Sequence, residues 1–509
     1  MADEIPGDVT AAVAEVASSS LRSTTGRLVQ SFAVYGTANF GIRALNFLLI
    51  LVYAHYLRPS DYGIIYLAEI YAVFLILFGN LSIDSALQRL YFQHNNNHEE
   101  LRSYLGSAIR FGIIAMATLV AFCVLVGGPI QRHLGFNQDV PFYPYMAMAI
   151  TTAAATQGIQ YRLAVYQAER RPTSYAFMSF LLFALTACLS VYGVVVLHRG
   201  AVGMLKGKLV AALLAFLVAA WKMHPLLIAR FQWRFVRETL SFSLPLVPHQ
   251  VMAGGLIVAD RFILYHYRNL NEVGVYSVAY TMGMVMFLVT QSLSQAWLPI
   301  FFELARGNED NHRVLGRIGS GLAILLLAIA CLGILLSPSF IQLALDVRYH
   351  AAIRLVPLVV IGYLFHAFFT LCNLSIMQAN RTKFILLISG TAFTANMILN
   401  FVMIPRWGMY GAAWATTIAY AIEALIAYLF AQRFFVLSYA VPPILGGLTV
   451  AGGAIALTQS AWILKWNGLF AVLSTIVAFA LLALIGKRDL RAGLTAIRKT
   501  RKREAQQGR

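Results

Sequence analysis

Long apolar runs, separated by short polar turns, make up most of this sequence. A helix that crosses a bilayer needs about 20 consecutive apolar residues. Uncharged runs of about this length occur at 111–131, 140–161, 172–197, 239–259, 273–302, 318–345, 355–380, 384–405, 434–464 and 466–486. The pattern therefore predicts ten membrane-spanning helices that carry no charged residue.

Four further apolar stretches contain one or two charged residues each. They are 31–57 with Arg43, 62–88 with Glu69 and Asp84, 200–221 with Lys206 and Lys208, and 407–430 with Glu423. With them the sequence predicts an all-α polytopic membrane protein of about fourteen transmembrane helices. The composition agrees, because 59% of the 509 residues are hydrophobic and only 12% are charged, against about 25% in soluble domains.

The distribution of Lys and Arg gives the expected topology, because these residues collect on cytoplasmic loops. With the N-terminus inside, 26 of the 39 Lys and Arg residues fall on the cytoplasmic side, 8 fall outside and 5 lie within spans. This bias predicts an even number of spans with both termini in the cytoplasm. It also accounts for the net charge of +18 without a nucleic-acid partner, because the excess lies in short loops and in the tail.

Several short motifs occur twice. AHYLRPSDYGII at 54–65 aligns with YHYRNLNEVGVY at 265–276, and YQAERRP at 166–172 aligns with MQANRTK at 377–383, both at an offset of 211. GAVGM at 200–204 matches GMYGA at 408–412 at an offset of 208. Each pair holds the same place in the order of spans, so we infer a duplicated six-helix unit; convergent turn chemistry is the alternative. Because six is even, the copies share one orientation about an axis along the membrane normal.

The repeat divides the chain into six parts. They are a cytoplasmic N-terminal segment at 1–30, an N-terminal lobe of six spans at 31–221, a basic linker at 222–242, a C-terminal lobe of six spans at 243–433, two additional spans within 434–486 and a basic cytoplasmic tail at 487–509. The linker combines basic and aromatic residues at helical spacing, which predicts an amphipathic helix at the cytoplasmic interface; a plain connecting loop is the alternative.

Charged residues inside spans indicate where a polar site lies. Each costs about 2.5–3.5 kcal/mol at mid-membrane unless it faces protein or water. Arg43 lies deep in its span, so we expect it to face a cavity or to pair with Glu69 or Asp84. Lys206 and Lys208 face the cavity or reach the outer interface. With Arg261, these residues are the candidate substrate-binding residues. Counting Arg110 as well, the spans hold five basic residues against four acids, which favours an anionic substrate.

Four acids within spans are candidates for ion coupling. They are Glu69, Asp84, Asp260 and Glu423. Asp260 and Arg261 are adjacent, so on a helix they should point about 100° apart and should not pair face to face.

The sequence contains no pattern of an enzyme active site. GMLKGKL at 203–209 has three residues between its glycines where a phosphate-binding loop has four, and NHEEL at 97–101 lacks the second histidine of a zinc helix. The four cysteines all lie in apolar runs, without the spacing of a disulfide framework or a thiolate metal site, and are expected to be small core residues. We therefore expect no catalytic residues, no metal site and no cofactor.

Three longer stretches resemble a known family. NFLLILVYAHYLRPSDYGIIYLAEIYAVF, ADRFILYHYRNLNEVGVYSVAYTMG and IPRWGMYGAAWATTIAYAI are similar to the polysaccharide-transport family, the Wzx-type oligosaccharide flippases of the MOP superfamily. The resemblance covers about residues 30 to 486. It implies two pseudo-symmetric six-helix lobes, as in MATE transporters, with two C-terminal helices that either form a groove for a lipid tail or only pack against the lobes.

The resemblance also implies a function. The expected substrate is an undecaprenyl-pyrophosphate-linked oligosaccharide, flipped from the cytoplasmic to the periplasmic leaflet of a bacterial inner membrane for O-antigen, capsule or exopolysaccharide assembly. Coupling to a proton or sodium gradient and a partner polymerase or export complex are further implications. The alternatives are a multidrug and toxin extrusion antiporter of the same fold or, from other classes, a membrane glycosyltransferase or an assembly scaffold.

Overall fold

The computed structural model describes residues 41–94, 97–133, 140–305, 309–381, 383–459 and 472–484. The expected cytoplasmic segment 1–30, the first ten residues of the span 31–57, and the tail 487–509 lie outside the described residues. The end of the expected span 434–464 and the start of 466–486 also lie outside them.

The described residues are almost entirely helical and include no β-strand. The transmembrane-length and connecting helices are Gly41–Tyr56, α2 (Pro59–Gly79), α3 (Ile83–His94), α4 (His98–His133), η1 (Phe142–Met146), α5 (Ala147–Ala168), α6 (Pro172–Val191), η2 (Tyr192–Val196), α7 (Gly200–Leu227), α8 (Trp233–Ser243), η3 (Leu244–Leu246), α9 (Val247–Tyr267), α10 (Leu270–Gly283), α11 (Val285–Ala305), α12 (Glu309–Ala344), η4 (Val347–Tyr349), α13 (Ala352–Gln378), α14 (Lys383–Trp407), α15 (Met409–Phe434), α16 (Val441–Gln459) and Val472–Leu484.

The helices follow the predicted spans in order. Ten helices of the described chain are long and apolar enough to cross a membrane. The other expected spans correspond to Gly41–Tyr56, α5, α9 and Val472–Leu484, which are shorter or less apolar. The structure is therefore that of an all-α, multi-pass membrane protein, and it is consistent with about fourteen spans.

Helix boundaries around the linker differ from the expected ones. α7 continues to Leu227, the predicted amphipathic helix corresponds to α8, and the next span begins at Val247 rather than at 239. Two prolines set these boundaries: Pro245 lies in the short η3 turn after α8, and Pro248 is in the first turn of α9, where its fixed φ favours a helix start.

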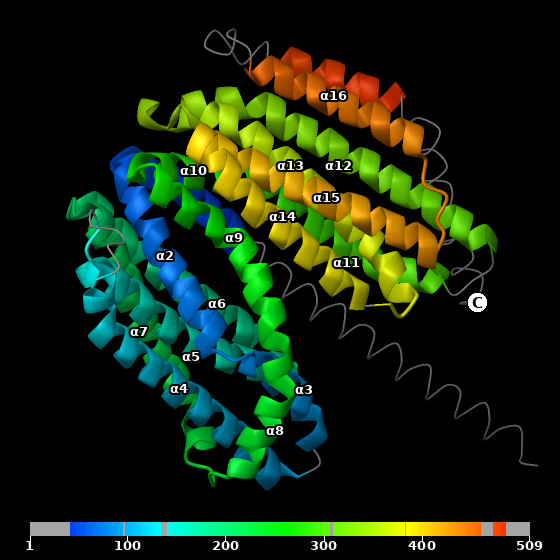
Figure 1. Cartoon of the computed structure of the whole chain (residues 1–509). Helices are drawn as coiled ribbons and strands as arrows, with labels where there is room; N and C mark the ends of the chain where they lie inside the picture. The colour runs from blue at the N-terminus through cyan, green and yellow to red at the C-terminus, as the bar shows by residue number, and fades with distance from the viewer. Residues whose placement is uncertain are drawn as a thin grey trace, which may run out of the picture.

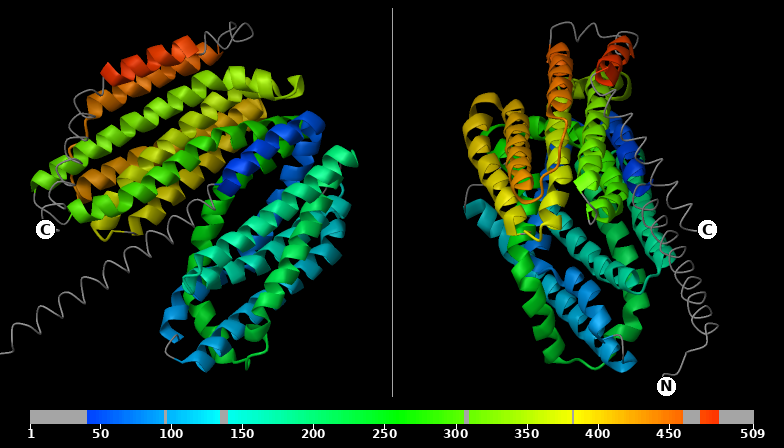
Figure 2. Two further views of the ribbon diagram at one scale, coloured as in Figure 1. Left: turned by 180° about the vertical axis from the view of Figure 1, so that it is seen from behind. Right: turned by 90° about the vertical axis from the view of Figure 1, so that its right-hand side faces the viewer.

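Two bundles of helices lie side by side (Figure 1). One bundle contains α2 to α7 and the other contains α10 to α15, while α9 runs between them and packs against both α2 and α14. The last helices, α16 and Val472–Leu484, lie on the outer side of the second bundle (Figure 2), where α16 packs on α12 and α13. The two lobes that the duplication predicts are thus present.

The lobes meet where α2 crosses α10, an end of the molecule that we call the crossing end. At this crossing Gly63 faces the backbone of Leu270, and Gly274 faces the backbone of Pro59. A methyl group on either glycine would overlap a carbonyl oxygen of the other helix. The glycine that the two copies share is therefore required where each copy packs on the other.

The acids that align in the two copies also have equivalent roles. Asp61 accepts a hydrogen bond of 3.3 Å from the backbone N–H of Ala201 at the start of α7, and Glu272 accepts one of 3.0 Å from Met409 at the start of α15. Carboxylates are favourable at a helix N-terminus because the free N–H groups and the helix dipole point at them. Each copy therefore uses its acid to fix the start of its own sixth helix.

A glycine with positive φ stands at the start of both helices: α7 begins at Gly200, with a φ of +53°, and α15 begins directly after Gly408, with a φ of +55°. We expect Gly408→Ala to lower the free energy of unfolding by about 1–3 kcal/mol, because an alanine there is strained and its Cβ would overlap the Glu272 carboxylate. The measurement is thermal unfolding of the purified protein. Gly390→Ala is the matched control, since its Cβ would enter open space, and it should not be destabilising.

A loop of the second lobe binds the first at the crossing end. The Tyr349 hydroxyl donates a hydrogen bond of 2.9 Å to the carbonyl of Leu57, and Arg348 reaches the carbonyl of His55 at 3.4 Å. Hydrogen bonds from the Arg348 side chain and backbone lower the pKa of Asp346 to about 2. Asp346 is therefore charged at any pH a living cell meets, and this contact does not titrate there.

At the opposite end, α8 holds the linker on the first lobe. Phe235 and Val236 are fully buried between α3 and α4. His94 lies 3.1 Å from Glu238 of α8 and 3.4 Å from Glu100 of α4. The linker is thus a docked amphipathic helix, with its arginines on the exposed side.

The cysteines are only partly as expected. Cys331 and Cys372 are buried and Cys123 is half-buried, but Cys188 is exposed. The expectation of a core position is wrong for Cys188, because an apolar run contains both core-facing and lipid-facing positions and their identities alone do not separate the two.

Candidate functional site: a charged cavity between the lobes

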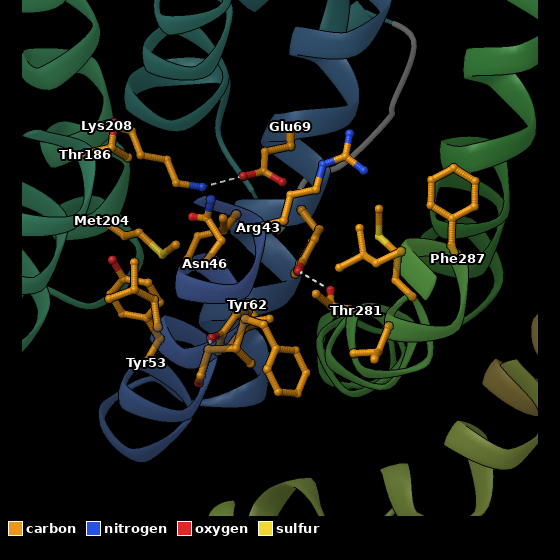
Figure 3. A pocket seen from close by; sticks show the side chains of 18 residues that line it. Arg43, Asn46, Tyr53, Tyr62, Glu69, Thr186, Met204, Lys208, Thr281 and Phe287 are labelled. Atoms are coloured by element: carbon orange, nitrogen blue, oxygen red, sulfur yellow. Dashed lines mark hydrogen bonds and ion pairs between the residues drawn. The ribbon is translucent and has the colours of Figure 1, made fainter. Parts of the chain in front are cut away.

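A cavity of about 430 Å³ lies between the two lobes (Figure 3). The first lobe contributes residues from Gly41–Tyr56, α2, α6 and α7, and the second contributes residues from α10 and α11. Its polar lining consists of Arg43, Asn46, Tyr53, Tyr62, Tyr66, Glu69, Thr186, Lys208 and Thr281. The remaining lining is apolar and includes Met204 and Phe287.

Two cations and one carboxylate face this cavity. Lys208 of α7 forms an ion pair of 2.5 Å with Glu69 of α2. Arg43 is exposed on the cavity, and no carboxylate of the described residues lies within ion-pair distance of it. Among the described residues, the lining therefore has a net positive charge, as an anion-binding cavity requires.

The structure brings together only two of the four candidate substrate-binding residues. Arg43 and Lys208 line the cavity, whereas Lys206 is exposed elsewhere on α7 and does not. The reason is geometric, since residues two apart on a helix point about 200° apart. Arg261 is 5% exposed within α9 and lies behind the lining, with its guanidinium 5.7 Å from the ring of Tyr66.

Asp260 and Arg261 form an ion pair of 3.2 Å, so the expectation that these neighbours do not pair is wrong. The Arg261 side chain folds back over its own helix, where it also lies 3.2 Å from Ser277 and 4.3 Å from the Tyr280 ring. The Tyr276 hydroxyl donates a 2.5 Å hydrogen bond to the second Asp260 oxygen. Pairing and hydrogen bonding offset the cost of burying both charges.

The other candidate acids lie in different places. Asp84 is at the start of α3 in the first lobe and accepts a 2.9 Å hydrogen bond from Asn80. Glu423 is buried in the second lobe, 3.0 Å from His366 and 3.4 Å from the Ser389 hydroxyl. Only Glu69 of the four acids lines the interlobe cavity.

Neutral residues that the sequence analysis did not select complete the site. Asn46 lines the cavity one helical turn after Arg43, and Tyr66 connects the lobes through a 2.8 Å hydrogen bond with Thr281. The i, i+3 spacing from Arg43 was a usable signal for Asn46. Tyr66 and Thr281 had no such signal, because their contact depends on how the two lobes pack.

These features define a class: a polytopic membrane protein in which two six-helix lobes enclose a charged cavity. A family model described as "Polysaccharide biosynthesis protein" matches residues 28–305. The chain belongs to this family. It is also 21% identical over 290 residues to the protein called Lsg locus putative protein 1 of Haemophilus influenzae, a match that covers 54% of this chain and 66%, just under two thirds, of that protein.

Solved structures share the fold. The lipid II flippase MurJ in an inward closed conformation has a TM-score of 0.68 and 18% identity, with 90% of this chain and 99% of that chain covered. A variant of the Vibrio cholerae MATE transporter VcmN has a TM-score of 0.55 and 15% identity, covering 81% and 98%. A MOP superfamily transporter of Pyrococcus furiosus has a TM-score of 0.55 and 10% identity, covering 79% and 95%. The chain thus has a fold of the MOP type.

Proposed function

We propose that this protein flips a polyprenyl-pyrophosphate-linked oligosaccharide across a bacterial inner membrane by alternating access. In this proposal it is a carrier rather than an enzyme, both termini are cytoplasmic, and the substrate moves to the periplasmic leaflet. The observation that carries the proposal is the interlobe cavity with Arg43 and Lys208 in its wall. The family, named for polysaccharide biosynthesis, and the fold shared with a protein named as a lipid II flippase support the same substrate class.

The charges of the cavity suit a pyrophosphate. A guanidinium binds phosphate oxygens in pairs, and a lysine ammonium adds a point charge. Arg43 is available on the cavity wall, whereas Lys208 is paired with Glu69. An incoming pyrophosphate therefore competes with the Glu69 carboxylate for Lys208, and substrate binding releases this carboxylate from its ion pair.

The size of the cavity sets what it holds. About 430 Å³ is within the range of about 300–1,000 Å³ typical of small-molecule sites. It suits the pyrophosphate and the sugar next to it, while the prenyl tail stays in the lipid between the lobes. A polysaccharide polymerase or export complex then receives the product.

We expect Arg43→Ala to reduce the amount of co-purified polyprenyl-pyrophosphate glycan by about tenfold or more, because a charge-assisted hydrogen bond contributes about 1.5–3 kcal/mol. Native mass spectrometry of the purified protein measures this amount. Surface polysaccharide in cells should fall with it. Lys206→Ala is the matched control, because this exposed lysine does not line the cavity. Unchanged glycan binding and export in Arg43→Ala would exclude the proposed site, and saturable binding of cationic dyes instead would favour drug antiport.

A further inference from the structure

We propose that the break between α2 and α3 is a binding site for a sodium ion. α2 ends at Gly79 and α3 begins at Ile83, within a single predicted span. Between them, Leu81 and Ser82 have positive φ, +49° and +56°, although neither is a glycine. Such backbone costs about 1–3 kcal/mol per residue and is kept where the surroundings or a function require it.

Oxygen atoms without partners gather at this break. Asn80 is 4% exposed and Ser82 is fully buried, yet the Asn80 Oδ1 and the Ser82 Oγ have no hydrogen-bond partner among the described residues. The Asn80 amide nitrogen donates to Asp84 at 2.9 Å, so it is the Asn80 oxygen that remains available. Unsatisfied buried oxygens are costly, and hard cations prefer ligands of this kind.

A third oxygen comes from α5, which packs on α2, α3 and α4. The Tyr161 hydroxyl is buried and makes no hydrogen bond of normal geometry with the described residues, and its polar neighbours are the Gln157 amide and the Asp84 carboxylate. Gly112 of α4 provides its space, because a Cβ there would be 2.8 Å from this hydroxyl. The hydroxyl is thus held deep in the lobe on the side of Asp84.

The charge at the break also favours a cation. The C-terminal end of α2 points its free carbonyls and the negative end of its dipole at the break. Broken helices in transporters bind sodium through such ends. Asp84 adds one formal negative charge, and among the described residues no basic nitrogen lies within ion-pair distance of it.

The basic residues of the neighbouring helices have their own partners. Arg162 of α5 lies 4.0 Å from the Tyr166 ring and 3.9 Å from Glu169. Arg110 of α4 donates to the carbonyl of Ala229 at 2.5 Å, and Arg89 of α3 lies over the Phe242 ring. His94, at the far end of α3, binds the acids of α4 and α8. The Asp84 carboxylate is therefore available to bind a mobile cation.

The test uses the full-length protein in lipid nanodiscs without glycan substrate. We expect saturable binding of radioactive sodium and a thermal unfolding midpoint that rises with the logarithm of sodium concentration when choline is exchanged for sodium at constant ionic strength. Asp84→Asn should abolish both effects, and Tyr161→Phe should weaken sodium binding about tenfold, as for one lost charge-assisted contact.

Tyr104→Phe is the matched control, because the Tyr104 hydroxyl is also buried in this lobe but donates to the carbonyl of Ala86 at 3.1 Å. Its sodium affinity should equal that of the unmodified protein. Equal sodium binding in Asp84→Asn, or no saturable binding in the unmodified protein, would overturn the site.

A role of this site in energising transport rests on the proposed function, but its occupancy does not. Arg43→Ala should retain sodium binding, so failure of the flippase proposal and failure of the sodium site give different results.

Discussion

Replacing Gly274 by valine should prevent the two lobes from packing at the crossing end. Even a Cβ at this position would overlap the Pro59 carbonyl, and the atoms on both sides of the contact are backbone, which cannot rotate away. Overpacking usually costs about 1–3 kcal/mol, and here the least costly response is separation of α2 from α10. We therefore expect the population to shift away from the conformation described above.

Cross-linking across the crossing end measures this shift. The four native cysteines are first replaced, and new cysteines are introduced at positions 55 and 348, whose residues are in contact. A bifunctional thiol reagent then cross-links these two positions when the lobes are packed at the crossing end. The cross-linked fraction should fall several-fold in Gly274→Val. Gly321→Val is the matched control, since Gly321 of α12 has open space beside it; an equal loss in both variants would refute a specific role for the crossing.

Replacing Asp260 by alanine should destabilise the protein by about 3–5 kcal/mol, the cost of leaving the Arg261 charge buried without its partner. Removing both charges in Asp260→Leu with Arg261→Met should recover most of this loss. The free energies of unfolding of Asp260→Leu, Arg261→Met and the double variant form a cycle that isolates the pair.

Glu69→Ala provides the comparison. It also removes the acid of an ion pair, but the Glu69 side chain is 39% exposed and that of Asp260 only 1%. Its effect should be much smaller. Equal effects of the two substitutions would mean that burial does not determine the energy of the Asp260–Arg261 pair.

The sequence was sufficient for the order of the helices and for the duplication. Apolar runs of about 20 residues are typical of membrane-spanning helices and rare elsewhere, and the repeated glycines Gly200 and Gly408 both have positive φ. The alignment of the two copies differs by one residue at one turn. Arg170 and Asn380 have matching positive φ values, so the structural offset between the copies is 210 at this turn, whereas the sequence alignment gave 211. A turn can absorb one residue without changing the helices that it joins.

The candidate site was predictable only in part. The sequence places Arg43 deep in its span, because the residue is far from both ends of the apolar run. Helical geometry alone shows that Lys206 and Lys208 cannot both face one cavity. The Lys208–Glu69 pair depends on the packing of α2 against α7, which no local pattern specifies. The Asp260–Arg261 pair was missed because the angle of about 100° between neighbouring residues on a helix describes only the directions of their Cβ atoms. A long arginine side chain can bend back over its own helix and reach the neighbouring carboxylate.

The crossing of α2 and α10 has a further implication. In a symmetric dimer with a two-fold axis, the residues nearest the axis meet their own copies in an isologous interface. Gly63 and Gly274 occupy aligned positions in the two halves and each packs on the other's helix. The contact has the pairing of an isologous homodimer interface, because each glycine faces the aligned helix start of the other copy, Leu270 or Pro59. A duplicated chain keeps such an interface as its central contact.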